Sequence, residues 1–404
     1  MYRPGRGFLN APGPTNIPER VIRAMSRQAI DLVDEELEDA VRRCFAGLRP
    51  ILGLEGGAVY LYSANGHGAW EAAIANVLAP GDLVLVPQTG QFSAGWVETA
   101  EANGVVCEIL PHDIRTSFPM AKLADRLAAD RQHKVKAVML VHTDTSTGVT
   151  HDPVAARAAL DACNHPALLM LDAVATLGTT KVDMKGWNID VCLSASQKGL
   201  MGPPGMAVVA ANDKALEVHR QTKRDRLYWD WTLRGEGPGY RSFCGTVPEH
   251  HIFALDEALT LIAEETLPAI FARHHAISRA VHVAVETWGK AGQLEINALN
   301  PAERAVGVTA IRVAAGIDPD LIRSTARRMF RTSVAGGLGD IRHSAFRIGH
   351  LGDMNAPMIL GALAGVQMAL SHLGIPHGKG ALDAAAEYMA EAAAEASPAL
   401  AAAQ

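Results

Sequence analysis

Residues 137–172 of the chain read AVMLVHTDTSTGVTHDPVAARAALDACNHPALLMLD. Two short apolar runs, Ala137–His142 and Ala167–Leu171, flank an amphipathic stretch of helical length, Pro153–Cys163. Parallel strands need a crossover connection of about a dozen or more residues, usually a helix. We therefore predict a strand–helix–strand unit here, with its two strands parallel to each other and buried on both faces.

The same alternation of apolar runs and helical patterns continues toward the N-terminus. Three more strands are predicted at Ala58–Tyr62, Leu83–Val86 and Val105–Leu110. Beyond Leu255 the pattern changes to long helices, and a smaller region of mixed helices and strands follows. We predict an α/β fold with an N-terminal arm over residues 1–17, a large domain over 18–265 and a small α+β C-terminal domain over 266–404.

The composition excludes several classes of protein. The 404 residues include 37 basic and 43 acidic side chains, a formal net charge of −6, and 49% are apolar. This balance excludes a strongly basic nucleic-acid-binding surface, and no apolar run reaches the roughly 18 residues that a membrane span needs. The five cysteines form no Cys-x-x-Cys pair, and no secretory leader is recognisable. We expect a cytoplasmic protein that binds neither nucleic acid nor membrane.

Three charged side chains stand alone in uncharged stretches of sequence. They are Lys198 within residues 191–212, Asp172 within residues 166–180 and Arg347 within residues 346–352. Burying a charge is costly unless the charge is used, so isolated charges are candidates for a functional site. Each also has a simpler interpretation: a loop lysine in solvent, an aspartate that caps a turn or helix, and an arginine in a salt bridge.

Together the three charges fit the chemistry of one cofactor. A lysine amine desolvated among small neutral residues has a lowered pKa and forms Schiff bases with carbonyl groups. Pyridoxal 5′-phosphate uses such a lysine, together with an acidic partner for its pyridinium nitrogen. Lys198 and Asp172 fit these two roles, and Arg347 fits a bidentate clamp for a substrate carboxylate.

Loops that follow the predicted strands supply the other groups that this cofactor needs. The segment Ser63–Gly68 leads from a strand into a helix, and backbone N–H groups at a helix N-terminus favour phosphate. Phe92 can stack on a flat ring, and Thr145 and Ser146 can hydrogen-bond a ring hydroxyl. All these loops leave the same edge of the predicted sheet, the edge where ligands of such sheets bind, so we expect them to converge.

Short motifs spread over nearly the whole chain occur in the order found in one enzyme family. They are Pro12–Pro18, Asn65–Glu71, Ser146–Val149, Asp172–Val174, Ser196–Met201, Pro203–Gly205 and Arg347–Gly352. In these motifs the chain resembles the class V, fold type I pyridoxal-phosphate aminotransferases of the alanine–glyoxylate and serine–glyoxylate group. The resemblance implies a large domain with a mostly parallel sheet of the seven-stranded type and a small α+β C-terminal domain.

The resemblance also implies a role for each site residue. Lys198 is expected to bind the cofactor covalently and to carry the proton between substrate and cofactor, and Asp172 to keep the pyridine nitrogen protonated. The other implied cofactor contacts are Asn65, Gly66, His67 and Gln197 at the phosphate, Phe92 and Thr145 at the ring, and Phe243 and Thr246 at a neighbouring subunit's phosphate. Arg347 is expected to bind the substrate carboxylate. These roles imply a homodimer with shared active sites that moves an amino group from serine or alanine to glyoxylate or another small 2-oxo acid.

Departures from the family pattern leave alternatives open. Leu32 and Val33 follow Asp31 where the family commonly has an aromatic residue or histidine and then arginine, so another amino donor, such as aspartate, stays open. A desulfurase-like lyase on the same fold needs a reactive cysteine in the small domain, and no cysteine follows Cys244. A dinucleotide-binding oxidoreductase is disfavoured, because the clusters Gly235-x-Gly237-x-Gly239 and Gly336-Gly337-x-Gly339 do not lie between a first strand and a helix. A metal enzyme is disfavoured, because no His-Glu-x-x-His motif occurs and the adjacent pairs His250–His251 and His274–His275 point to diverging faces of a helix.

Overall fold

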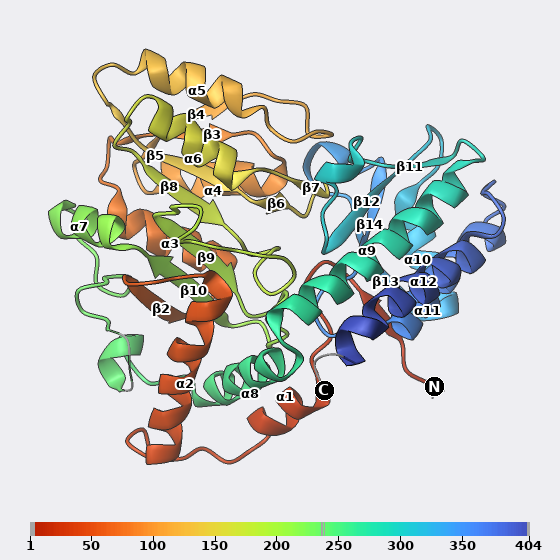
Figure 1. The fold of residues 1–404 in the computed structure, drawn as a ribbon, viewed down its shortest axis with the longest axis horizontal. Helices are drawn as coiled ribbons and strands as arrows, with labels where there is room; N and C mark the ends of the chain where they lie inside the picture. Colours follow the sequence, from red (N-terminus) through yellow and green to blue (C-terminus); the bar gives the residue numbers. More distant parts are fainter. Residues whose placement is uncertain (1–4, 236, 238, 402–404) are drawn as a thin grey trace.

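The computed structural model describes residues 5–235, 237 and 239–401, with side chains as far as residue 394. In the described part, helices surround two separate β-sheets, a larger sheet from residues 58–211 and a smaller one mainly from residues 294–349 (Figure 1). Helix α9 (Leu267–Gly289) leads from the larger part to the smaller one. Among the described residues, no helix has both the length and the apolar character that a membrane crossing needs.

The larger sheet has seven strands in the order β2-β10-β9-β8-β5-β3-β4. Their bounds are β2 (Ala58–Ser63), β3 (Leu83–Pro87), β4 (Val106–Leu110), β5 (Val135–Val141), β8 (Leu168–Asp172), β9 (Val191–Ala195) and β10 (Met206–Ala211). Neighbouring strands from β9 to β4 are parallel, whereas β10 runs antiparallel to both β2 and β9. The unit predicted over residues 137–172 is confirmed, because β5 and β8 pair in parallel across helix α6 (Pro153–Ala162).

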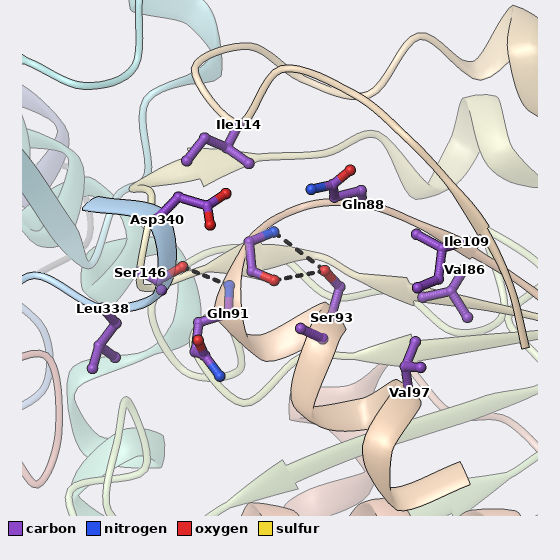
Figure 2. A pocket seen from close by; sticks show the side chains of 13 residues that line it. Val86, Gln88, Gln91, Ser93, Val97, Ile109, Ile114, Ser146, Leu338 and Asp340 are labelled. Atoms are coloured by element: carbon purple, nitrogen blue, oxygen red, sulfur yellow. Dashed lines mark hydrogen bonds between the residues drawn. The ribbon is translucent and has the colours of Figure 1, made fainter. Parts of the chain in front are cut away.

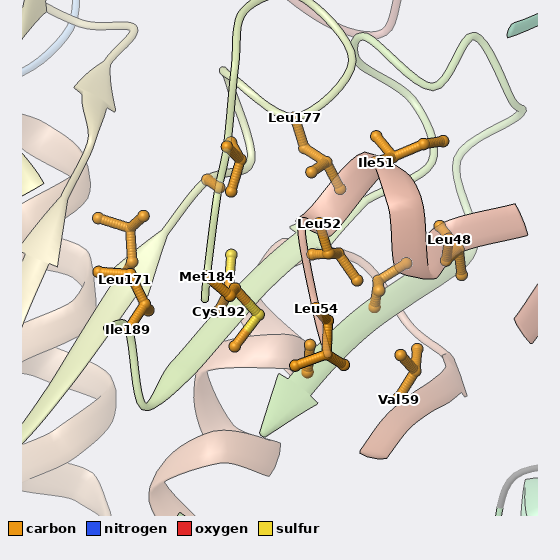
Figure 3. Packing of buried hydrophobic residues seen from close by; sticks show 14 of the residues in the cluster. Leu48, Ile51, Leu52, Leu54, Val59, Leu171, Leu177, Met184, Ile189 and Cys192 are labelled. Carbon is orange, nitrogen blue, oxygen red and sulfur yellow. The ribbon is translucent and has the colours of Figure 1, made fainter. Parts of the chain in front are cut away.

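Helices cover both faces of the larger sheet (Figure 1). Successive side chains of a strand point to opposite faces. Accordingly, Leu169 and Leu171 of β8 lie in one hydrophobic cluster, and Leu168 and Met170 lie in another. The first cluster, partly drawn in Figure 3, includes side chains from α2 (Glu35–Leu52), α5 (Met120–Ala129), α6 and α8 (Glu249–Glu265). The second includes side chains from α3 (Gly66–Val77), α4 (Gln91–Ala102) and α7 (Asp213–Gln221). Burial on both faces explains why these strands are continuous apolar runs in the sequence.

The smaller sheet has the order β1-β13-β14-β12-β11. Its strands are β1 (Phe8–Asn10), β11 (Leu294–Ile296), β12 (Val308–Val313), β13 (Thr332–Gly336) and β14 (Ala345–Gly349). The helices of this region are α9, α10 (Pro319–Phe330), α11 (Ala356–His372) and α12 (Ala381–Ala401). Strand β1 pairs in parallel with β13, so part of the predicted N-terminal arm belongs to the C-terminal sheet. The domain boundaries after residues 17 and 265 stay predictions.

The remaining elements are short or lie outside the two sheets. They are α1 (Glu19–Met25), the two-stranded hairpin β6 (Thr143–Asp144) and β7 (Val149–Thr150), and the 3₁₀ turns η1 (Tyr240–Phe243), η2 (Pro301–Glu303) and η3 (Gly339–Ile341). The β6–β7 hairpin follows directly after β5, at the carboxyl edge of the larger sheet. This hairpin brings side chains from its turn to the cavity described next.

Candidate active site

A cavity of about 280 Å³ lies at the carboxyl edge of the larger sheet. Eight of the predicted site residues line it: Asn65, Gly66, His67, Phe92, Thr145, Asp172, Gln197 and Lys198. The other lining residues are Gly13, Pro14, Trp70, Val141, Thr143, Val174, Ala175 and Pro204. The predicted convergence of these strand-end loops is thus seen in the structure. Convergence alone does not test the role of each residue, and those roles stay predictions.

Lys198 lies in the turn after β9 and is only 9% exposed. Burial, with a contribution from the nearby charge of Arg347, lowers the pKa of its amine to about 8, although Asp172 acts in the opposite direction. The amine donates a hydrogen bond to the carbonyl oxygen of Pro12. A side chain at Gly13 would approach the Lys198 side chain to 2.5 Å, so only a glycine lets the backbone pass this close.

Asp172 is the last residue of β8 and is 3% exposed. Its Oδ1 accepts a hydrogen bond from the backbone N–H of Val174 at 2.8 Å, and its Oδ2 accepts one from Trp70 Nε1 at 2.7 Å. Burial raises the pKa of this carboxyl to about 6, while both hydrogen bonds lower it. A carboxylate held in this way stabilises a cationic group placed next to it.

The N-terminus of α3 faces the same cavity through Asn65, Gly66 and His67. Asn65 is the N-cap, and its Oδ1 accepts hydrogen bonds from the backbone N–H groups of His67 at 3.0 Å and Gly68 at 3.4 Å. No acidic side chain lies in the first turn. A helix N-terminus without a competing carboxylate favours a bound anion such as phosphate.

Asp144 was missed in the sequence, although it is completely buried at the edge of this site. Its Oδ1 accepts hydrogen bonds from the backbone N–H and hydroxyl of Ser146, at 2.9 and 2.5 Å. Its Oδ2 accepts from Thr89 Oγ1 at 3.1 Å and from the backbone N–H of Phe92 at 3.0 Å. The carboxylate thus ties the β6–β7 turn to the start of α4 and sets the positions of Phe92 and Thr145. An aspartate beside several hydroxyl residues was the only signal in the sequence.

Arg347 of β14 does not line the cavity but contacts its wall. Its Nη1 donates to the carbonyl oxygen of Thr145 at 2.8 Å, and its Nε donates to that of Gly336 at 2.6 Å. Arg347 is 6% exposed, and burial lowers its pKa to about 10, with Asp144 acting in the opposite direction. Within the part of the chain that is described, no ion pair joins Arg347 to a carboxylate. A buried guanidinium of this kind favours an anionic ligand.

A second cavity, of about 250 Å³, is lined by Ser146, which was a candidate contact for the ring hydroxyl, and by twelve residues that were not predicted (Figure 2). It lies between the start of α4 and the loop around η3, and Asp340, Gln88 and Ser146 contribute to its walls. The hydroxyl of Ser146 accepts a hydrogen bond from the backbone N–H of Gln91 at 3.0 Å, shown as a dashed line in Figure 2. Ser146 also donates to Asp144, so the wall of the second cavity belongs to the same hydrogen-bond network that Asp144 organises.

Phe243 and Thr246 are not brought to the Lys198 cavity within one chain. Phe243 is 2% exposed and packs in the first hydrophobic cluster, and Thr246 is exposed at the surface. Their predicted contact with the cofactor of a neighbouring subunit stays a prediction.

Comparisons with known proteins identify a family and several similar enzymes. The family profile described as Aminotransferase class-V matches residues 7–337. The serine–glyoxylate aminotransferase of Methylorubrum extorquens is 36% identical over 395 residues, covering 96% of this chain and 97% of that protein. The L-aspartate–glyoxylate aminotransferase of Paracoccus denitrificans is 35% identical over 376 residues, covering 93% and 94%.

Solved structures show the same relationship. The ureidoglycine–glyoxylate aminotransferase from Bacillus subtilis has a TM-score of 0.87 and 27% identity, covering 96% of this chain and 99% of that one. The alanine–glyoxylate aminotransferase from Nostoc has a TM-score of 0.81 and 27% identity, covering 91% and 96%. The fold and family predicted from the sequence motifs are confirmed, and the chain belongs to the class V aminotransferases.

Proposed function

We propose that the protein is a pyridoxal-phosphate-dependent transaminase that moves an amino group from a small amino acid, serine or alanine, to glyoxylate or another small 2-oxo acid. The observation that carries this proposal is that a buried lysine, Lys198, and a buried aspartate, Asp172, line the same cavity. Relatives named serine–glyoxylate aminotransferase, from Methylorubrum extorquens and Hyphomicrobium methylovorum, support the same reaction.

The groups around the cavity fit pyridoxal 5′-phosphate. A lysine amine, a carboxylate and a helix N-terminus suited to phosphate all line it, and so does the aromatic ring of Phe92. In addition, the buried Oε1 of Gln197 has no hydrogen-bond partner among the described residues, so this amide has capacity left for a ligand. When bound, the cofactor supplies a carbonyl that condenses with amines and a ring that accepts electrons from the substrate.

Lys198 can act as both nucleophile and base. With a pKa of about 8, roughly one amine in ten is neutral at pH 7, whereas an ordinary lysine with a pKa of 10.5 is almost entirely protonated. The neutral amine attacks a carbonyl, and it can also take a proton from the substrate Cα and return it. Asp172, largely ionised above its pKa of about 6, stabilises a protonated ring nitrogen.

The surroundings of the cavity support a donor with one carboxylate. We assign the binding of that carboxylate to Arg347, which contacts the cavity wall at Thr145 and can use N–H groups other than the two that donate to backbone carbonyl oxygens. Apart from Lys198, no arginine or lysine lines the cavity in the described part of the chain, so a second carboxylate has no strong partner from this subunit. Aspartate is the alternative donor, because one relative, from Paracoccus denitrificans, is named L-aspartate–glyoxylate aminotransferase.

We also propose that the working unit is a homodimer. The predicted roles of Phe243 and Thr246 support this proposal, because they require a second copy of the chain beside the cofactor. Val33, Leu227 and Tyr240 are 74%, 71% and 65% exposed, and a subunit contact over these apolar side chains would bury them.

A donor-by-acceptor screen tests the reaction. With glyoxylate as acceptor, we expect serine or alanine to give at least about tenfold higher kcat/KM than aspartate, since an unpaired second carboxylate is costly to bury. Glycine should form in a one-to-one ratio with the 2-oxo acid of the donor. Faster turnover of aspartate contradicts the donor assignment, and release of sulfide or alanine from cysteine without glycine formation contradicts transamination.

Substituting Arg347 tests the carboxylate site. In Arg347→Gln, loss of charge-assisted hydrogen bonds is expected to lower kcat/KM about 10- to 100-fold for both amino donor and oxo-acid acceptor. The affinity for pyridoxal 5′-phosphate is expected to change less than these rates, because Arg347 contacts the cavity only through the carbonyl oxygen of Thr145. The control is Arg312→Gln on the paired strand β12. Unchanged steady-state kinetics in Arg347→Gln, or loss of the cofactor, contradicts the assignment.

A further inference from the structure

The indole of Trp70 is bonded directly to the buried carboxylate of the site. Trp70 lies about one turn into α3 and lines the cavity, and its Nε1 donates to Asp172 Oδ2 at 2.7 Å. The other oxygen of this carboxylate accepts from the backbone N–H of Val174 at 2.8 Å. Two donors from two different elements therefore hold the carboxylate in one orientation, and each oxygen keeps a second lone pair for another donor.

Trp70 is itself held rigidly. It is 2% exposed, its ring is stacked on Trp96 with 6.1 Å between centroids, and the edge of the ring contacts Phe92. A side chain at Gly95 would come within 3.3 Å of the indole, so this glycine lets helix α4 pack closely on it. An indole fixed on several sides keeps its N–H pointing in one direction.

We propose that Trp70 is a positioning residue whose indole N–H orients the Asp172 carboxylate toward the ring nitrogen of bound pyridoxal phosphate. The proposal rests on the proposed cofactor site. Trp70 belongs to the same helix whose N-terminus faces the cavity, so α3 contributes to both the phosphate end and the nitrogen end of the cofactor. The hydrogen bond from Trp70 lowers the pKa of Asp172, against the effect of burial.

The test compares two buried tryptophans that differ in one property. Trp70→Phe removes an indole that donates to Asp172, whereas Trp96→Phe removes a stacked indole whose buried Nε1 has no hydrogen-bond partner among the described residues. Apoprotein of each variant is titrated calorimetrically with pyridoxal phosphate and with its carbocyclic analogue, in which C–H replaces the ring nitrogen. Only pyridoxal phosphate has a ring nitrogen with which the Asp172 carboxylate can interact.

We expect Trp70→Phe to lose about tenfold in affinity for pyridoxal phosphate and to bind the carbocyclic analogue as the unmodified protein does. Trp96→Phe should leave the ratio of the two affinities unchanged. If Trp70→Phe loses the same factor in affinity for both ligands, Trp70 has a packing role only and the proposal is overturned. The proposal is also overturned if Trp96→Phe changes the ratio of the two affinities as much as Trp70→Phe does. If the unmodified protein binds neither ligand, the proposed cofactor site and the proposed role of Trp70 are both contradicted. If it binds both ligands, the variants test the role of Trp70 alone.

Two further measurements separate positioning from packing. Without the indole N–H, the pKa of Asp172 rises, so the acid-side loss of pyridoxal-phosphate affinity should move to higher pH in Trp70→Phe. In an Asp172→Asn background, Trp70→Phe should have no further effect on the affinity ratio, because the two residues act as one unit. If Trp70→Phe does not fold, 3-benzothienylalanine at position 70 keeps the ring shape and replaces only the N–H, and the same outcomes apply.

Discussion

Lys198→Ala is expected to lower kcat for transamination by about 10⁴-fold and to abolish the absorbance band of covalently bound cofactor. The physical reason is that one amine serves as the covalent attachment and as the base, and no other lysine lines the cavity in the described part of the chain. Stopped assays of glycine formation and an absorbance spectrum measure the two effects. Lys181→Ala is the control, because Lys181 is exposed and pairs with Asp183 at the surface.

The pKa of Lys198 adds a pH dependence to this prediction. Burial lowers it to about 8, so the reactive neutral form grows as pH rises toward 8 and is the major form above it. The rate at which apoprotein takes up pyridoxal phosphate should therefore level off above about pH 8, rather than keep rising toward the ordinary lysine value of 10.5. The role assigned to Lys198 is refuted if Lys198→Ala keeps the absorbance band of bound cofactor or keeps the activity. It is also refuted if the uptake rate of the unmodified apoprotein has its pH midpoint near 10.5.

Asp172→Asn is expected to have the second largest effect, a loss of about 10²- to 10³-fold in kcat. Asparagine accepts a hydrogen bond but carries no charge, so a protonated ring nitrogen loses its partner and the ring withdraws electrons less well. The affinity of the unmodified apoprotein for pyridoxal phosphate should fall on the acid side as Asp172 becomes protonated near its pKa of about 6, and this step should be absent in the variant. Steady-state rates check the loss in kcat and calorimetric titrations over a pH series check the affinity, with Asp152→Asn as the control for the loss of an exposed carboxylate.

Stability provides an independent check on Asp172. Because burial raises its pKa in the folded state above the ordinary value of 3.8, the folded protein binds more protons than the unfolded chain between these two values. The free energy of unfolding of the unmodified apoprotein should therefore fall, relative to that of Asp172→Asn, as pH rises from 3.8 to about 6, and stay level above. If the difference between the two proteins does not depend on pH in this window, Asp172 is not buried as described.

The order and type of most elements around the site follow from local sequence. The apolar run predicted at Ala137–His142 corresponds to β5, and the amphipathic stretch from Pro153 corresponds to α6. Strands β9 and β10 were not among the predicted strands, and nothing in the all-apolar run of β10 indicates that it pairs antiparallel with both neighbours. Strand β1 was part of a presumed arm, because three residues carry too little periodicity to indicate pairing with a strand more than 300 residues away.

In the candidate site, too, only some of the residues could be identified from local sequence. Lys198, Asp172 and Arg347 could be identified because a charge isolated among uncharged residues is visible in a short segment and costly to bury without use. Trp70 and Asp144 could not, because an indole and a carboxylate have many ordinary roles. Their importance lies in partners that are distant in sequence, Asp172 for one and the start of α4 for the other.

Sequence alone was sufficient for the alternating α/β pattern, the enzyme family and the chemical identity of the charged groups, since periodicity, motif order and charge isolation are properties of the linear chain. Tertiary structure was needed to learn that the glycine at position 13 lies against Lys198, that Arg347 reaches the wall formed by Thr145, and that an indole fixes the key carboxylate. The physical reason is that these contacts arise only when chain closure and packing bring distant segments within hydrogen-bonding distance, where burial then sets the pKa values on which the chemistry depends.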